Sequence, residues 1–137
     1  MTQSLDFGKS GQTLVVVHSA ETPTDAEWDA WVERMAQRDY KNILISSLGG
    51  GPNARQRRKT NKFWQNTQIP RFALVTTSRF VLAVVKAFNW FLDDQLKPFP
   101  PSQMREALDY IEVPESERDA LILATDTLRA RLVASAA

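Results

Sequence analysis

The chain has 137 residues, of which 43% are hydrophobic and 24% charged, and its formal net charge is +1. This composition is typical of one soluble globular domain, and a chain of this length buries roughly two-thirds of the surface that its unfolded form exposes. With no cysteine and one histidine, it cannot hold a cysteine nucleophile, a disulfide framework, an iron–sulfur centre or the common zinc sites. We therefore expect a domain without metal or cofactor.

Charge is distributed unevenly along the chain. Residues 1–39 carry three basic and seven acidic side chains, residues 40–92 carry nine basic and no acidic ones, and residues 93–137 carry five and nine. Two interpretations are open for the basic middle: acidic neighbours offset its charge within the same fold, or it forms a surface for an anion or an acidic partner. Five of its cations lie in one short segment, namely Arg55, Arg57, Arg58, Lys59 and Lys62.

Neither the start of the chain nor its most apolar segment indicates a secreted or membrane protein. Met1–Lys9 contains an acidic residue and no apolar stretch, so it does not match a secretory signal, and we expect a cytoplasmic protein. Phe72–Leu92 is strongly apolar, but Arg79 and Lys86 would each cost about 3 kcal/mol at the centre of a bilayer. This segment instead predicts a buried strand that runs into a buried helix.

The N-terminal third predicts a β-hairpin followed by a helix. Ser4–Phe7 and Thr13–Val17 are short extended runs on either side of a glycine-bounded turn at Gly8–Gly11. Thr24 and Glu27 have the spacing of a capping box, which predicts that a helix begins there. Apolar residues then recur with helical spacing and predict its buried face: Trp28, Trp31, Val32 and Met35.

The middle third predicts a buried strand at Asn42–Leu48, a glycine-rich loop at Gly49–Asn53 and a helix at Ala54–Thr67. The apolar side of that helix is thin, so we expect it at the rim of the sheet. A second buried strand is predicted at Phe72–Thr77, followed by a helix over Arg79–Leu92 that Ser78 caps.

The last third predicts one more strand and two helices. Leu96–Phe99 contains a proline and is flanked by two more, which confines this strand to an edge of the sheet. Ser102 is expected to cap a helix that ends near Ile111, and the final helix is expected to start at Pro114–Ser116. A narrow apolar stripe follows in that helix, made of Leu121, Thr125, Leu128 and Leu132.

Strands that alternate with helices predict an α/β fold with a mainly parallel sheet covered by helices. We expect an α/β domain over residues 1–113 and a helical extension over residues 114–137, which packs on this domain or on a partner. The helix over Phe80–Leu92 is apolar around more than half its circumference. A homodimer is one way to bury the surplus, and folding of the final helix over the second apolar side of this helix, within the same chain, is the other.

Several stretches also carry a resemblance to a known family. They are the hairpin into Leu14–Val17, Gly51–Arg57, Ala73–Arg79 with Val84–Trp90, and Lys97–Pro101 with Ala107–Ile111. Over roughly residues 3–112 the chain resembles the STAS domain, the fold of anti-sigma-factor antagonists, in a divergent bacterial branch of small stand-alone proteins. The resemblance implies a four- to five-stranded, mainly parallel sheet with an N-terminal hairpin, and a role in signalling through protein contacts.

Regulatory STAS proteins are switched by phosphorylation of a serine or threonine just before the second helix. Here the loop Gly49–Ala54 has no hydroxyl residue, and the nearest candidates, Ser46 and Ser47, end the preceding strand. The resemblance therefore implies protein contact through helix surfaces rather than a kinase-controlled switch.

Polar residues gather where the predicted parallel strands end. Ligands of open α/β sheets bind outside the carboxyl ends of the strands, helix N-termini attract anions, and glycines let a bound group approach the backbone closely. The loop matches neither common nucleotide-binding glycine motif. The candidate residues for an anion or a nucleotide are Ser46, Ser47, Gly49, Gly50, Gly51, Asn53, Arg55, Thr77, Ser78 and Arg79.

Enzymatic activity is not expected. His18 ends a strand, but the block that contains the candidate serines has no acid to orient it, and no Gly-x-Ser-x-Gly motif occurs. The leading hypothesis is a non-enzymatic STAS-like signalling or scaffolding module that binds another protein. The basic middle favours an acidic partner. Anion binding is the alternative, and nucleic-acid binding through residues 55–62 is the third. The candidate partner-binding residues are Arg57, Arg58, Lys59, Phe80, Trp90, Leu121, Leu128 and Leu132.

Overall fold

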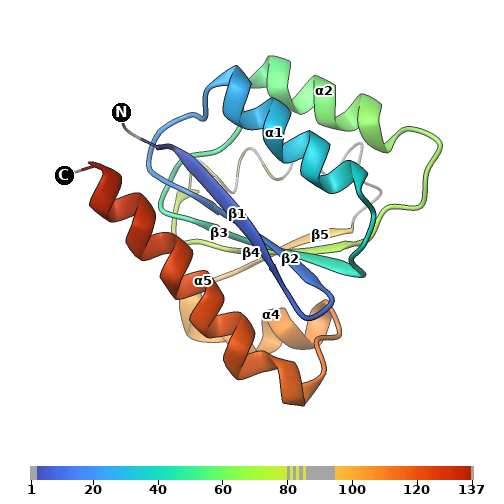
Figure 1. The fold of residues 1–137 in the computed structure, drawn as a ribbon, viewed down its shortest axis with the longest axis vertical. Coiled ribbons are helices and arrows are strands. Elements are labelled where there is room, and N and C mark those ends of the chain that lie inside the picture. The colour runs from blue at the N-terminus through green and yellow to red at the C-terminus, as the bar shows by residue number, and fades with distance from the viewer. Residues whose placement is uncertain (1–2, 80, 82, 84, 86–94, 137) are drawn as a thin grey trace.

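The computed structural model describes residues 3–79, 81, 83, 85 and 95–136. In this part of the chain a five-stranded sheet has α1 and α2 on one face and α4 and α5 on the other (Figure 1). The elements in chain order are β1 (Leu5–Ser10), β2 (Thr13–His18), α1 (Asp25–Ala36), β3 (Asn42–Ser47), α2 (Ala54–Trp64), β4 (Arg71–Val75), β5 (Leu96–Phe99), the 3₁₀ turn η1 (Pro101–Gln103), α4 (Met104–Tyr110) and α5 (Glu115–Ala136).

The sheet confirms the predicted α/β fold. Its strand order is β1-β2-β3-β4-β5, with β1 antiparallel to β2 and the other neighbours parallel. Each crossover thus moves the chain on by one strand in the same direction. Because such crossovers are right-handed, α1 and α2 lie on the same face. Most of the helix expected at Arg79–Leu92 lies outside the described residues, although Arg79, Val81, Ala83 and Val85 are helical.

The hairpin turn begins three residues later than predicted, at Gly11 instead of Gly8. Ser10 pairs with Thr13, so the loop is Gly11–Gln12, and β1 continues through Gly8. Gly11 has a φ of 58°, a value at which glycine avoids the steric cost that other residues pay, and it lets the twist of the turn match the strands. Gly8 is an ordinary strand position that leaves room for the side chain of Leu128 in α5.

The outer edge of β1 is covered by carboxylates. The backbone amides of Ser4 and Leu5 donate to Oε2 of Glu27 in α1, at 2.9 and 3.1 Å, and the amide of Phe7 donates to Oδ1 of Asp6 at 2.9 Å. An uncovered strand edge is a template for pairing with another chain. A second copy that extended the sheet at β1 would therefore have to displace these contacts.

Helix α1 begins and packs as predicted. Oγ1 of Thr24 accepts a hydrogen bond from the amide of Glu27, and the carboxylate of Glu27 accepts one from the amide of Thr24, at 3.1 and 2.9 Å. The predicted face is buried against the sheet, and it consists of Trp28, Trp31, Val32 and Met35.

Helix α2 is shorter than predicted and is capped by a box that the sequence analysis missed. Asn53 caps it together with Gln56, and its buried residues are Gln56, Thr60 and Trp64, two of which are polar. Nε1 of Trp28 donates to the carbonyl of Gln56 and to Oγ1 of Thr60, at 3.0 and 2.8 Å. Hydrogen bonds to α1 therefore hold α2, in addition to its apolar contacts.

The opposite face of the sheet is covered by the last two helices. Leu121, Leu128 and Leu132 of α5 are buried in a cluster with strand residues of this chain. The stripe is thus buried within this chain, but against β1 and β2. Val81 and Val85, in the described part of the Phe80–Leu92 helix, pack on the other face of the sheet, so α5 does not cover this part of the helix as one alternative expected. Phe80 and Trp90, two other candidate partner-binding residues, lie outside the described residues.

One predicted cap is wrong. Ser102 lies inside η1, and Gln103, which precedes α4, makes no capping hydrogen bond through its side chain. The prolines at 100 and 101 start the 3₁₀ turn first, and α4 follows from its end.

None of the helices in the described residues is both long enough and apolar enough to cross a membrane.

The packing of α5 predicts very different effects for two leucines that are two residues apart and lie on opposite sides of the helix. Leu121 is 0% exposed and Leu123 is 67% exposed. We expect Leu121→Ala to lower the free energy of unfolding by about 2–5 kcal/mol, because it leaves a cavity against the sheet. Leu123→Ala, the matched control, should change it by no more than about 0.5 kcal/mol. Urea denaturation measures both, and equal effects would show that α5 does not pack on the sheet in solution.

Candidate functional site

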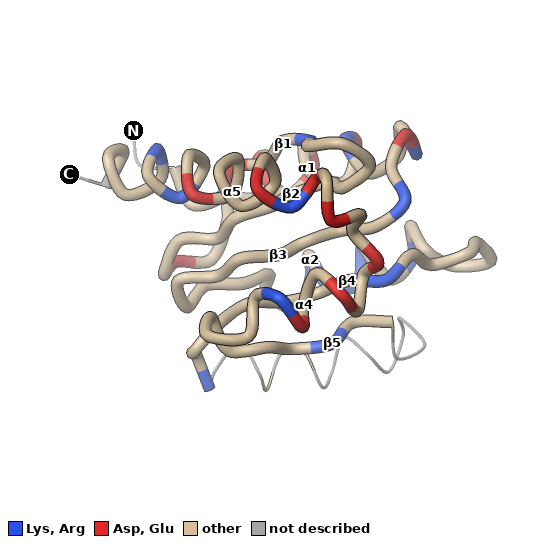
Figure 2. Tube along the Cα trace, turned by 90° about the horizontal axis from the view of Figure 1, so that it is seen from below, with Lys and Arg blue, Asp and Glu red and all other residues tan. Residues whose placement is uncertain are grey.

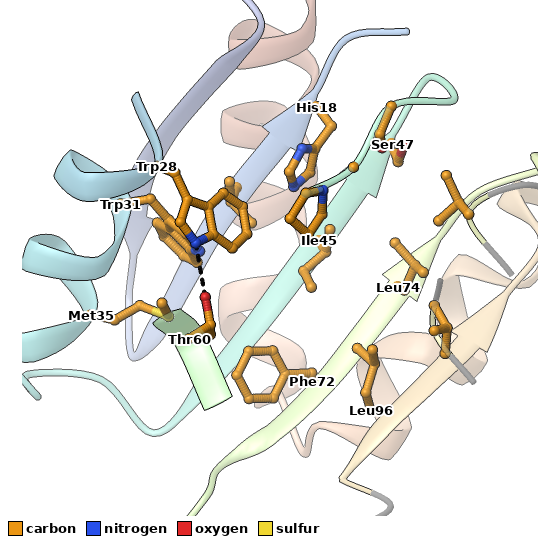
Figure 3. A pocket seen from close by; sticks show the side chains of 16 residues that line it. His18, Trp28, Trp31, Met35, Ile45, Ser47, Thr60, Phe72, Leu74 and Leu96 are labelled. Carbon is orange, nitrogen blue, oxygen red and sulfur yellow. Dashed lines mark hydrogen bonds between the residues drawn. The ribbon is translucent and has the colours of Figure 1, made fainter. Parts of the chain in front are cut away.

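The carboxyl ends of β2 and β3 meet beside an apolar cavity on the α1–α2 face of the sheet (Figure 3). His18 ends β2, Ser47 ends β3, and the two residues are register partners. The cavity lies where α/β folds usually bind ligands. Strand residues form its floor and α1 forms a wall, and the lining includes Val16, Ile45, Leu74, Trp28 and Trp31.

Ile45 marks the cavity in the middle of the sheet. Its neighbours in β3 are buried, whereas Ile45 is only half-buried although β3 is the central strand. On this face a central strand position is normally covered by packed side chains. Beside the gap, α2 presents Gln56 and Thr60 toward α1 rather than large apolar side chains.

The glycine loop is braced by hydrogen bonds. Oγ of Ser47 donates to the carbonyl of Gly50 at 2.6 Å and accepts from the amide of Gly49 at 3.1 Å. The amide of Gly50 donates to the carbonyl of Ser19 at 2.8 Å. A Cβ on Gly50 would lie 2.2 Å from the carbonyl oxygen of Glu21, so only glycine fits there, whereas a Cβ on Gly51 would meet no atom within 4 Å.

The adjacent serines of β3 lie on opposite faces of the sheet. Ser47 lines the cavity together with Gly50 and Gly51. Ser46 is buried, and because strand residues alternate it points to the α4–α5 face. The structure therefore does not bring Ser46 and Ser47 into one site.

The other candidate anion-binding residues are largely engaged with the chain itself. The side chain of Asn53 caps α2, and Nη1 of Arg55 pairs with Asp25 at 3.2 Å. Oγ of Ser78 accepts from the amide of Val81 at 3.3 Å. Thr77 and Arg79 are exposed. Anion binding at this edge stays a prediction, with fewer free donors than the sequence indicated.

His18 is a buried, neutral histidine. It is 4% exposed, and burial lowers its pKa from 6.5 to about 4, although the nearby Glu27 carboxylate acts in the opposite direction. Its ring lies 6.1 Å from that of Trp28. The imidazole makes no hydrogen bond to any described residue, and its Nδ1 is fully buried. Ser47 donates to Gly50 instead, so the described atoms form no Ser–His pair.

The basic segment on α2 faces acidic residues of α1. Arg55 pairs with Asp25 and Lys59 pairs with Asp29. Basic and acidic positions are also interspersed on α4 and α5 (Figure 2). Neighbours in the same fold thus offset part of the basic charge, as one of the two interpretations anticipates.

Two cations of α2 stay outside these pairs. Arg58 and Lys62 are exposed, and neither makes an ion pair with any described residue. Arg57 is half-buried, and its guanidinium donates to the carbonyl of Pro52 at 2.9 Å.

Within the described ranges, no group of His, Asp and Glu side chains could hold a metal ion.

The bracing of the glycine loop predicts a contrast between neighbouring glycines. We expect Gly50→Ala to lower the free energy of unfolding by about 1–3 kcal/mol, because the methyl group would overlap the backbone of Ser19 and Glu21. Gly51→Ala should cause no loss, because the position is open. Thermal melts of the two variants measure the contrast, and a tolerated Gly50→Ala would contradict the described loop.

The pKa of His18 predicts a loss of stability in acid. The pKa of His18 is about 4 in the folded chain and 6.5, its ordinary value, in the unfolded chain. The unfolded chain therefore binds the proton more tightly than the folded chain does, and this favours unfolding once the pH falls below 6.5. We expect His18 to lower the free energy of unfolding by about 3 kcal/mol between pH 7.5 and pH 4. His18→Phe should remove this part of the pH dependence in urea titrations. Parallel profiles for the two proteins would show that His18 is accessible to water.

Comparison with known proteins finds no match to this chain among protein-family models, curated proteins or solved structures. Its function therefore has to be argued from the geometry of its own residues.

Proposed function

We propose that this chain is a non-enzymatic, STAS-like signalling or scaffolding module that binds an acidic protein through the outer face of α2. The observation that carries the proposal is the pair of exposed cations Arg58 and Lys62, which lie one helical turn apart. The proposal keeps the cytoplasmic location and the bacterial origin expected from the sequence.

The contrast within α2 supports this surface. Arg55 and Lys59 are directed to acids of α1, and their charge is spent within the fold. Arg58 and Lys62 lack such partners among the described residues, so their charge is available to carboxylates of another protein. Charges of this kind govern the rate and specificity of association more than the affinity.

The chemistry of the sheet edge also favours binding over catalysis. Hydroxyl and amide groups there hold the loops, and His18 contacts neither an acid nor a nucleophile among the described residues. A general base has to lie within hydrogen-bond reach of the group that it deprotonates.

Charge reversal on α2 tests this proposal. Partners are captured from a native extract with the intact chain, and one is purified for binding titrations. Arg58→Glu and Lys62→Glu should each weaken its binding by about three- to tenfold, because exposed charge contacts contribute modestly. Arg105→Glu on α4 is the matched control, since Arg105 is also exposed, has no ion pair with the described residues and lies on the opposite side of the sheet.

Three outcomes would count against this interface. Equal effects of the α2 and α4 variants would place the partner elsewhere. Retention of nucleic acid with a steep loss of affinity between low and moderate salt would favour nucleic-acid binding. A dimer mass in light scattering over a concentration series, abolished by Arg58→Glu, would make a second copy of this chain the partner of α2.

A further inference from the structure

The apolar cavity on the α1–α2 face is not used by the proposed protein contact. Its volume is about 60 Å³, and one side of it is open. An enclosed cavity that takes up a benzene molecule has a volume of about 150 Å³. This smaller cavity therefore has room for part of one aromatic ring, and the rest of the molecule would lie in its open side.

The walls of the cavity suit an aromatic ring. Trp28 and Trp31 come from α1, Phe72 comes from β4, and most of the remaining lining is aliphatic (Figure 3). Aromatic rings pack favourably edge-on or offset against one another, beyond the area that they bury. The indole N–H of Trp28 is already engaged with α2, so this side chain offers its ring rather than its donor.

His18 supplies the polar group of the site. Its side chain points toward the cavity beside Trp28 in Figure 3. The hydroxyls of Ser47 and Thr60, which also line the cavity, have hydrogen-bond partners, whereas the imidazole has none among the described residues. A buried polar group without a partner costs free energy that a suitable ligand atom recovers.

The described charges around the cavity disfavour an anionic ligand. Among the residues that the structure describes, no Lys or Arg lines the cavity. The carboxylate of Glu27 is close enough to influence His18, and it would repel a second negative charge. A charged group without a counterion is strongly disfavoured in such an apolar environment.

We infer that this cavity binds a small uncharged aromatic molecule that carries one hydroxyl or N–H group, with its ring against Trp28 and Trp31 and its polar group on His18. The ligand class follows from a small, partly open apolar cavity, its aromatic walls and an imidazole without a partner among the described residues. A phenol is the simplest molecule of this class.

Fluorine NMR of three probes with the intact chain tests the inference. The probes are 4-fluorophenol, fluorobenzene, which lacks the polar group, and 4-fluorobenzoate, which is charged. We expect saturable line broadening with 4-fluorophenol, removed by competition with unlabelled phenol, and about tenfold weaker binding of fluorobenzene. The benzoate should not bind.

Two variants locate the probe. His18→Phe keeps an apolar ring but cannot form the hydrogen bond, so it should bind 4-fluorophenol and fluorobenzene equally. Ile45→Phe fills the floor of the cavity and should abolish both, whereas Leu123→Ala on the exposed side of α5 should change neither. Circular dichroism checks that each variant is folded, and the His18→Phe comparison and the phenol competition decide the matter if Ile45→Phe is not.

The inference is overturned by any of four results. They are no saturable binding of the neutral probes, equal affinity for the two neutral probes in the unmodified chain, tighter binding of the benzoate, or binding that a folded Ile45→Phe leaves unchanged. None of these results bears on the α2 surface, so this test and the charge-reversal test fail independently.

Discussion

The order of the parallel strands is the constraint on which the rest of this structure depends. Because β2, β3, β4 and β5 follow one another across the sheet, the crossover helices α1 and α2 lie on one face. The other face would be exposed if the chain ended after β5. Helices α4 and α5 cover it, and the leucine stripe of α5 is therefore core rather than surface. Arg131 of α5 and Asp6 of β1, paired at 2.8 Å, add an ion pair at the margin of this contact.

The α1–α2 face holds the apolar cavity, and α2 contributes Thr60 to its lining. This helix buries Gln56 and Thr60, whose hydrogen bonds with Trp28 hold it against α1. These polar side chains are turned to a neighbouring helix rather than to the sheet. The cavity lies over Ile45, which is only half-buried although β3 is the central strand.

Most of the polar groups in the glycine-rich loop and at the start of α2 stabilise the chain itself. Ser47 and Gly50 fasten the loop, Asn53 caps α2, and Arg55 reaches Asp25. Among the residues that the structure describes, two places keep polar or charged groups that the chain itself does not use. One is the apolar cavity with His18, and the other is the outer face of α2 with Arg58 and Lys62.

The sequence by itself determined the features that depend on near neighbours along the chain. The capping box at Thr24, the buried face of α1 and the edge position of β5 all follow from residues close in sequence, and the structure confirms them. The apolar stripe of α5 is also visible in the sequence, but whether it packs within the chain or on a partner was left open. The resemblance to STAS domains anticipated the mainly parallel sheet, while the protein contact that it implies stays a prediction.

Only the tertiary structure decided which distant residues meet. The sequence grouped Ser46 with Ser47, yet the alternation of side chains along β3 sends them to opposite faces. Gly50 proved to be a packing residue because the backbone of Glu21 lies against it, and Lys59 is offset because α1 brings Asp29 beside it. The cavity has no local signal, because it arises from the space between α1, α2, four strands and the helix that holds Val81 and Val85. Contacts of this kind depend on topology, which periodicity and capping motifs do not specify.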